Sequence, residues 1–357
     1  MRVRLEDVCE KESSKLKQSD VIDQNGLYPV YGASGYLGNI NTYQQLNYYV
    51  AVVKDGAGIG RTMLLPPKSS IIGTMQYLIP KDNILPEYLY YVVKAKHLEK
   101  YFSGATIPHI YFKDYKNEQF DLVSFEEQRE IINRIKKIET IIDNLSKNLV
   151  LLDELVRARF VEMFGDPEDN PFKWDKMPLS NIMLNANNGM ARRGNDENGN
   201  IVLRLVELQD GYIDYSNPNR ICLNENEKKR YLLKNNDFLF ARVNGNPDNV
   251  GRCAVFHDIG ENVYHNDHII RVHFNKELLN GVFASELINS NFGKRQLKKR
   301  IKTSAGQYTV SQDGIGAIVS IVPPLELQNQ FASFVEEIDK SRLLSNHSLS
   351  LIKSITF

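Results

Sequence analysis

The sequence predicts an α+β protein built from two α/β domains, each followed by one long helix. The first observation is a joint that occurs twice, as LVSFEEQREIINRI at 122–135 and as VPPLELQNQFASFV at 322–335. Each copy leaves an apolar run, opens a helix and carries Glu-x-Gln, and the two copies lie 200 residues apart. A heptad pattern after the joint and β-rich segments around it are the other observations. A duplicated domain explains all of them.

The first long helix is predicted by apolar residues in alternating steps of four and three, the spacing of a coiled-coil seam. Ser124 and Glu127 form an S-x-x-E capping box at its start, and Gly165 followed by Pro167 predicts its end. About 38 residues at ~1.5 Å each give a rod of roughly 55–60 Å. The predicted seam residues are Ile131, Ile135, Ile138, Ile142, Leu145, Leu149, Leu152, Val156 and Met163.

The second long helix begins after Pro323 and Pro324, and proline is favoured in the first turn of a helix. Two of its seam positions are polar, so we expect it to be the weaker strand of a pair. The expected partner of each long helix is the other long helix of the same chain. The matching seam residues are Phe331, Val335, Ile338, Arg342, Ser345, Leu349 and Ile352.

The remaining segments are rich in β-branched and aromatic residues, which predicts a mixed α/β body in each half. The predicted strands are 48–53, 201–208, 238–243, 268–274 and 317–322, and the predicted short helices are 85–102 and 283–302.

Two weaker pairs of segments extend the repeat. KDGAGIGR at 54–61 matches 241–252, because each has a strand end, a turn with glycine and a Gly-Arg pair. GATIPHI at 104–110 matches SAGQYTV at 304–310. The chain is therefore divided into a first domain (1–121), a first long helix (122–165), a second domain (166–321) and a second long helix (322–357).

Composition excludes several classes of protein. The 44 Lys and Arg balance the 44 Asp and Glu, which argues against a simple basic coat for nucleic acid. Positive charge gathers instead in NFGKRQLKKRIK at 291–302. Cys9, Cys222 and Cys253 lack C-x-x-C spacing, so we predict no zinc site or disulfide and expect buried thiols. No signal peptide and no window of ~18 apolar residues is present, so we expect a cytoplasmic protein.

The sequence lacks the motifs of adenine methyltransferases and of ATP-driven enzymes. VPPL at 322–325 and DNPF at 169–172 both fail the Asn/Asp-Pro-Pro-aromatic tetrad of adenine methylation, and no G-x-x-x-x-G-K-[ST] loop is present. GAGIG at 56–60 predicts a tight turn between strands rather than a cofactor loop. HNDH at 265–268 predicts a structural or DNA-facing turn rather than a metal site. We therefore predict no catalytic and no metal-binding residue.

In their order, these features resemble the specificity (S) subunit of type I restriction–modification systems. The resemblance is carried by YPVYGASGYLG (28–38), KDGAGIGR, GATIPHI and the first long helix, and by FLFARVNGN, SAGQYTV and VPPLELQNQF in the second half. It implies two target recognition domains in a pseudo-twofold arrangement, joined by two antiparallel coiled-coil helices. It also implies sequence-specific binding of double-stranded DNA with a bipartite, asymmetric target.

The same resemblance implies partners. They are two adenine-N6 methyltransferase subunits and, in a full assembly, two motor-nuclease (restriction) subunits. S-adenosylmethionine, ATP and Mg²⁺ are then expected on those partners, and no cofactor is expected on this chain. Two alternatives stay open: a coiled-coil scaffold or adaptor that does not bind DNA, and a self-contained modification enzyme.

A DNA reader needs cationic anchors for phosphates and polar side chains for base edges. The expected anchors are Lys294, Arg295, Lys298, Lys299, Arg300 and Lys302. The expected readers in the first domain are Tyr31, Ser34, Tyr36, Lys54, Arg61 and His109. Those in the second domain are Arg192, Arg193, Arg242, Asn244, Gln307 and Tyr308.

Overall fold

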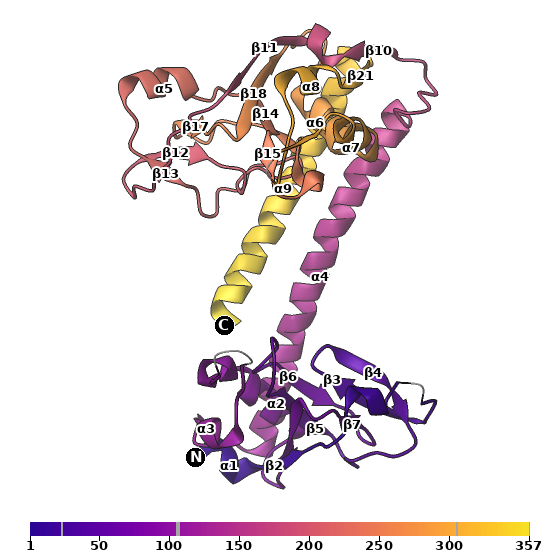
Figure 1. Cartoon of the computed structure of the whole chain (residues 1–357), viewed down its shortest axis with the longest axis vertical. Helices are drawn as coiled ribbons and strands as arrows, with labels where there is room; N and C mark the ends of the chain where they lie inside the picture. Colours follow the sequence, from indigo (N-terminus) through magenta and orange to yellow (C-terminus); the bar gives the residue numbers. More distant parts are fainter. Residues whose placement is uncertain (23, 105–107, 305, 357) are drawn as a thin grey trace. The chain divides into compact units, whose positions relative to one another are not determined.

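The structure, a computed structural model, describes residues 1–22, 24–104, 108–304 and 306–356. Parts of the paired segments 104–110 and 304–310 therefore lie outside the described residues. The chain forms two compact units: unit 1 is Met1–Leu145 with the chain from Leu349 onward, and unit 2 is Ser146–Ser348. Each unit combines helices with sheets (Figure 1), so the predicted α+β class is confirmed.

Unit 1 contains a four-stranded antiparallel sheet in the order β2-β8-β5-β6, a three-stranded sheet β4-β3-β7 and a ribbon β1-β9. The strands are β1 (Arg2–Arg4), β2 (Cys9–Ser13), β3 (Tyr28–Gly32), β4 (Gly35–Ile40), β5 (Tyr49–Val53), β6 (Thr62–Leu65), β7 (Ser70–Ile71), β8 (Met75–Pro80) and β9 (Gln119–Asp121). The short helices are α1 (Leu5–Val8), η1 (Gln18–Asp20), α2 (Pro86–Lys94), η2 (Leu98–Tyr101) and α3 (Phe112–Tyr115).

Unit 2 contains the sheets β11-β18-β14-β16, β13-β12-β17 and β15-β20-β19 and the ribbon β10-β21. The strands are β10 (Asp175–Pro178), β11 (Met183–Asn188), β12 (Asn200–Leu203), β13 (Arg220–Ile221), β14 (Phe238–Ala241), β15 (Val243–Asn244), β16 (Cys253–Val255), β17 (Val263–His265), β18 (Ile269–Phe274), β19 (Lys302–Ser304), β20 (Gln307–Thr309) and β21 (Val319–Val322). The short helices are η3 (Leu179–Asn181), α5 (Glu225–Tyr231), η4 (Pro247–Asn249), α6 (Gly281–Asn289), α7 (Asn291–Lys298) and α8 (Gln312–Gly316).

The two units share one topology. In each four-stranded sheet, the first strand along the chain pairs with the fourth, the fourth with the second and the second with the third. The sheets β4-β3-β7 and β13-β12-β17 each combine one antiparallel pair with one parallel pair, β3 with β7 or β12 with β17. A duplicated domain, as the sequence predicts, accounts for this correspondence.

One buried amide connects each long helix to its own unit. In unit 1 the Gln128 side chain is 1% exposed, and its Oε1 accepts a hydrogen bond from the Leu85 N–H at the start of α2 (2.8 Å). Its Nε2 donates to the carbonyls of Val123 (3.0 Å) and Asn83 (3.4 Å). The amide therefore joins the helix start to two segments of the domain.

Gln328 makes the same three contacts in unit 2. Its Oε1 accepts from the Asn280 N–H at the start of α6 (2.8 Å), and its Nε2 donates to the carbonyls of Pro323 (2.7 Å) and Leu278 (3.0 Å). Glu126 and Glu326, by contrast, are exposed. The glutamine is thus the structural half of the repeated Glu-x-Gln pair.

The long helices are α4 (Phe125–Phe164), which begins in unit 1 and ends in unit 2, and α9 (Leu325–Thr356). Glu127 and Ser124 exchange the hydrogen bonds of the predicted capping box. Gly165, with φ of +74°, follows the last turn of α4, so the predicted stop is confirmed.

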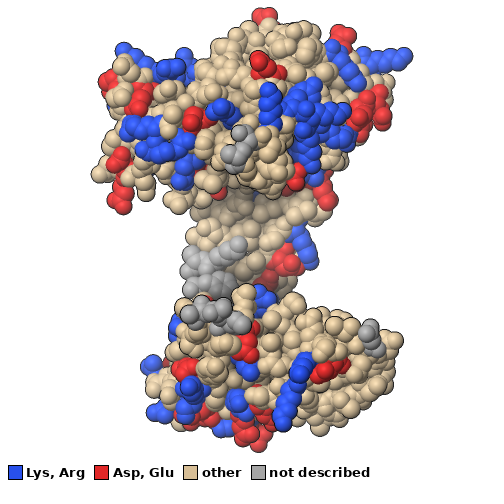
Figure 2. Space-filling model, in the orientation of Figure 1, with Lys and Arg blue, Asp and Glu red and all other residues tan. Residues whose placement is uncertain are grey.

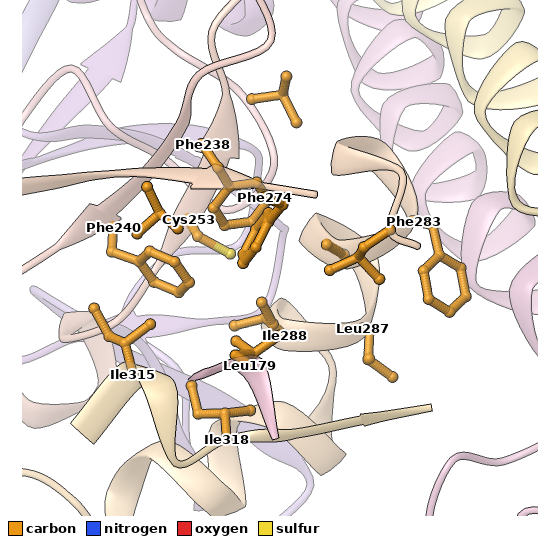
Figure 3. Packing of buried hydrophobic residues seen from close by; sticks show 14 of the residues in the cluster. Leu179, Phe238, Phe240, Cys253, Phe274, Phe283, Leu287, Ile288, Ile315 and Ile318 are labelled. Atoms are coloured by element: carbon orange, nitrogen blue, oxygen red, sulfur yellow. The ribbon is translucent and has the colours of Figure 1, made fainter. Parts of the chain in front are cut away.

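Within unit 2, the end of α4 and most of α9 lie side by side and antiparallel. Four phenylalanines form the contact, with ring centroids of Phe160 and Phe164 of α4 lying 5.4 and 5.6 Å from that of Phe331 of α9. Phe283 of α6 packs on the same two α4 rings and points toward the long helices (Figure 3). Farther along, Arg342 Nη2 of α9 lies 2.7 Å from Asp153 Oδ1 of α4.

That ion pair explains one polar seam position, because the Arg342 guanidinium binds a carboxylate of the opposite helix. Val156, Phe331, Val335 and Leu349 are buried among the predicted seam residues, and the remaining apolar ones are half-buried. The sequence analysis expected Met163 at the end of the seam, but Met163 is only half-buried. Phe160 and Phe164, which were not predicted, are buried there instead.

Some predicted elements are shorter in the structure. The strand expected at 201–208 ends at Leu203, because Glu207 accepts hydrogen bonds from the backbone and guanidinium of Arg204 and closes a turn. The helix expected at 85–102 ends at Lys94, since His97 adopts a left-handed φ of +49°. The helix expected at 283–302 breaks at Ser290, whose hydroxyl caps α7.

Among the described residues, no helix combines the length and the apolar character needed to cross a lipid bilayer.

We expect Gln328→Leu to lower the free energy of unfolding by roughly 2–4 kcal/mol, because it leaves buried backbone groups of three segments unpaired. Chemical denaturation measures this loss. Gln330→Leu is the matched control, since Gln330 is exposed on the same helix. Equal stability of both variants would contradict a structural role for the amide.

His265 gives the fold a pH dependence. It is fully buried in β17, and burial, followed by the charge of Arg271, lowers its pKa to about 3. Between that value and the unfolded value of ~6.5, the unfolded chain binds a proton that the native chain does not. Stability therefore falls as pH drops, by about 1.4 kcal/mol per pH unit from this residue. Urea unfolding between pH 6.5 and 4.5 should show a smaller slope for His265→Gln than for the wild type.

Candidate nucleic-acid interface

The glycine loop of unit 1 is held by backbone hydrogen bonds at the end of β5. The Val53 N–H donates to the Arg61 carbonyl, and the Gly60 N–H donates to the Val53 carbonyl, both at 2.9 Å. Gly60 has φ of +80°, where a side chain would be strained. The loop 54–61 is thus a closed turn whose shape depends on the main chain.

Unit 2 repeats this arrangement at the end of β14. The Ala241 N–H donates to the Arg252 carbonyl, and the Gly251 N–H donates to the Ala241 carbonyl, both at 2.8 Å. Gly251 also has φ of +80°. The predicted match between 54–61 and 241–252 is therefore confirmed, including the Gly-Arg pair.

The second predicted pair of segments joins these loops in the same way. The Ile110 N–H donates to the Lys54 carbonyl in unit 1, and the Val310 N–H donates to the Arg242 carbonyl in unit 2, both at 2.9 Å. Lys54 and Arg242 therefore occupy equivalent positions, each where a buried strand leaves the sheet.

In unit 1 the β3–β4 hairpin adds an aromatic and largely uncharged surface. The rings of Tyr31 and Tyr36 form an edge-to-face pair with centroids 6.2 Å apart, and Tyr36 is exposed. Arg61 Nη1 donates to the Ala33 carbonyl next to Ser34 (2.8 Å), which fastens the hairpin turn to the glycine loop. Figure 2 shows mostly uncharged side chains over this part of unit 1.

An acid connects the other candidates of unit 1. Asp55 Oδ1 lies 2.7 Å from His109 Nδ1, and Asp55 Oδ2 lies 3.5 Å from Lys54 Nζ. The structure thus brings the hairpin turn, the glycine loop and the His109 segment into one linked group of loops.

In unit 2, Arg192 is bound within its own domain. Its Nε and Nη2 donate to the two carboxylate oxygens of Glu227 (3.1 and 2.9 Å), and Nη2 also donates to the Cys222 carbonyl (2.6 Å). This hydrogen bonding lowers the pKa of Glu227 and raises the pKa of Arg192. Arg192 therefore holds a loop onto α5.

Arg193 is occupied in a similar way. Its Nη2 donates to Asp267 Oδ1 (2.6 Å) and lies 3.0 Å from His268 Nε2, while Nη1 donates to the Ala191 carbonyl (2.8 Å). The His268 nitrogen must be unprotonated to accept this bond. Burial is the main cause of a lowered pKa for His268, which agrees with a neutral ring.

The remaining readers of unit 2 meet at the small sheet β15-β20-β19. Asn244 lies opposite Tyr308 in the antiparallel pairing, and Gln307 is exposed next to it. Arg242 precedes β15 and is half-buried, and its Nη1 donates to the Asp267 carbonyl (3.2 Å). These four candidates form one edge of unit 2.

The predicted phosphate anchors on and after α7 are largely bound to acids. Lys294 Nζ lies 2.6 Å from Asp210, Lys298 Nζ lies 2.8 Å from Asp248, and Arg295 forms an ion pair with Glu168. Arg300 donates to two backbone carbonyls and so holds its own loop. Within the described part of the chain, Lys299 and Lys302 are exposed and form no ion pair.

Lys and Arg side chains gather on unit 2 at the place where Figure 1 has α7 (Figure 2). An open hollow of about 320 Å³ lies there. Three cations and one carboxylate line it, and each of the three cations is paired with an acid, so the hollow offers little free positive charge. The lining residues are Pro247, Asp248, Val250, Asn291, Lys294, Arg295, Leu297, Lys298 and Ile301.

The sequence reasoning missed the acids that hold these cations. Asp55, Asp210, Asp248 and Asp267 each bind one or two candidate residues. Two of these acids could have been suspected from the sequence, because Asp55 directly follows the candidate Lys54 and Asp267 belongs to the HNDH motif. The HNDH turn is indeed part of the candidate surface, through Asp267 and His268.

Within the described ranges, no group of three or more His, Cys, Asp or Glu side chains could hold a metal ion. Cys9 and Cys253 are buried as expected, but Cys222 is exposed, so the expectation of three buried thiols was wrong for Cys222. Burial raises the pKa of the Cys9 thiol to about 12.

Comparison with known proteins gives a consistent result. The family model of the type I restriction modification DNA specificity domain matches residues 1–152. The StySPI specificity subunit of Salmonella potsdam is 25% identical over 78% of this chain and 65% of its own length. The EcoKI specificity subunit of Escherichia coli K12 is 25% identical over 54% of this chain and 42% of its own length. The chain thus matches less than two thirds of the length of either relative.

Two solved structures share the fold. One is the crystal structure of a type I restriction–modification S subunit from M. genitalium, with TM-score 0.62, 16% identity and coverage of 100% of this chain and 93% of that chain. The other, from work on complex assembly and conformational transition of the type I system, has TM-score 0.57, 13% identity and coverage of 100% and 95%. By its matched domain and its relatives, the chain is similar to the specificity subunits of type I restriction–modification systems.

Proposed function

We propose that the chain reads a bipartite, asymmetric DNA sequence and has no catalytic group of its own. The observation that carries this proposal is one loop frame built twice with different side chains. Unit 1 places Lys54 and His109 on that frame, with tyrosines on the adjoining β3–β4 hairpin, and unit 2 places Arg242, Asn244 and Tyr308 there. Two unlike surfaces on one frame suit two unlike DNA elements.

We further propose that α4 sets the spacing between the two elements. It is one continuous helix of 40 residues, which corresponds to roughly 60 Å. Two DNA half-sites one turn apart are separated by about 34–36 Å, which is within that length.

The proposed partners are two adenine methyltransferase subunits and, in a larger assembly, two restriction subunits. Apolar side chains that remain exposed on the long helices of unit 2 support a docking role, because a partner helix would remove them from water. They are Val150, Leu151, Leu155, Val161, Leu343 and Leu344. S-adenosylmethionine, ATP and Mg²⁺ would be bound by these partners, and the assembly would act in the cytoplasm.

The full chain should bind random-sequence duplexes with an affinity that falls steeply with salt. Cations that neutralise phosphates release counterions, so even two such contacts reduce affinity by roughly tenfold between 50 and 200 mM salt. Fluorescence anisotropy across a salt series measures this slope. A chain that does not bind DNA, or binds it independently of salt, would favour the scaffold alternative.

Exchanging residues 1–120 for the same segment of another family member should change one element of the recognised sequence and leave the other intact. The reason is that each unit carries its own sheets and loops. Methylation mapping by long-read sequencing of cells that express the hybrid with its partners would show the motif. Changes in both elements would contradict independent readers.

A further inference from the structure

Four arginines lie at or beside the candidate loops of unit 2, and three of them are paired with a carboxylate. Arg192 is bound by Glu227 and Arg193 by Asp267 and His268. Arg252 donates to Gln209 and Asn249 side chains (2.9 and 2.7 Å) and lies 3.2 Å from Asp210. Each of these guanidinium groups holds protein segments together.

Arg242 differs from these three. One nitrogen, Nη1, donates to the Asp267 carbonyl (3.2 Å). Among the residues that the structure describes, its guanidinium has no carboxylate partner and no second hydrogen bond. It therefore keeps its charge and one edge of its donor fork available.

The backbone of Arg242 is fixed on both sides. Its N–H donates to the His268 carbonyl (2.7 Å), and its carbonyl accepts from the Val310 N–H (2.9 Å). The carbonyl that anchors Nη1 is fixed as well, because the Asp267 N–H donates to the Met190 carbonyl (2.9 Å) and its carboxylate binds Arg193. One nitrogen of the guanidinium is thus held by the ordered turn of HNDH.

An anchored guanidinium with a free edge matches one base better than the others. Guanine presents the acceptors O6 and N7 side by side in the major groove, and two parallel N–H groups of arginine meet both. Anchoring one nitrogen beforehand reduces the rotamer freedom that binding would otherwise remove. Asn244 follows two residues later with Tyr308 opposite it, so neighbouring bases would meet polar side chains.

Resting on the proposed function, we propose that Arg242 is the residue by which unit 2 requires a guanine, through its O6 and N7, in the DNA element that it recognises. Arg193 and Asp267 act as positioning residues, since they order the carbonyl that holds Arg242. The equivalent residue of unit 1 is Lys54, whose ammonium lies near Asp55 and lacks the planar fork. The guanine requirement is therefore assigned to the Arg242 position of unit 2 and not to its Lys54 counterpart.

Binding-site selection from a randomised duplex pool, with the purified full chain, tests this assignment. The wild type should select two elements, one of which contains a required guanine. Arg242→Ala should lose the preference at that single position and bind the best site about 5- to 150-fold more weakly. Arg242→Lys should keep part of the preference. Arg220→Ala is the matched control, because Arg220 is bound by Glu261 in the same unit.

A duplex with 7-deazaguanine at the required position removes N7 alone. It should weaken the wild type and leave Arg242→Ala unaffected, and thermal unfolding should show both proteins folded. Equal weakening of all sequences by Arg242→Ala, with a smaller salt slope, would make Arg242 a phosphate contact and overturn the assignment while DNA reading stands. Unchanged selection by the variant would also overturn it. A wild type that selects no motif would instead overturn the proposed function itself.

Discussion

A buried glutamine amide determines how each long helix starts, and the rest of each unit depends on that start. Gln128 and Gln328 bond the same three kinds of backbone group: the N–H that opens a short helix and two carbonyls. A carboxylate could not replace the amide, because the site needs one acceptor and two donors. The repeated joint is therefore a structural requirement met twice.

Local signals in the sequence predicted the framework well. The capping box, the heptad steps and Gly165 place α4 within a few residues, because each depends on neighbours in the chain. The strand expected to continue to 208 failed where the Glu207 carboxylate captures the Arg204 backbone. Alternation of apolar residues does not reveal such side-chain capture.

The sequence predicted which residue types occur in the candidate site, but not which of the cations are already paired with acids of the same chain. Loops and cations were found, yet Arg193 meets Asp267 across 74 positions of sequence, and Arg295 meets Glu168 across 127. Such distant pairing leaves no local pattern. These distant ion pairs decide which cations remain available to bind DNA, because an arginine paired with a carboxylate of the same chain stabilises the fold instead. The expected anchors Lys294, Arg295 and Lys298 all form such intramolecular ion pairs.

The reading loops are closed by main-chain bonds, at Val53 and Lys54 in one unit and at Ala241 and Arg242 in the other. Every residue type except proline supplies those donors and acceptors. Apart from Gly60 and Gly251, whose left-handed backbone favours glycine, side chains on the loops are thus free to vary while the turn itself persists. If these loops read DNA as proposed, point substitutions on them would suffice to change the target sequence, without first having to re-evolve the scaffold that displays them.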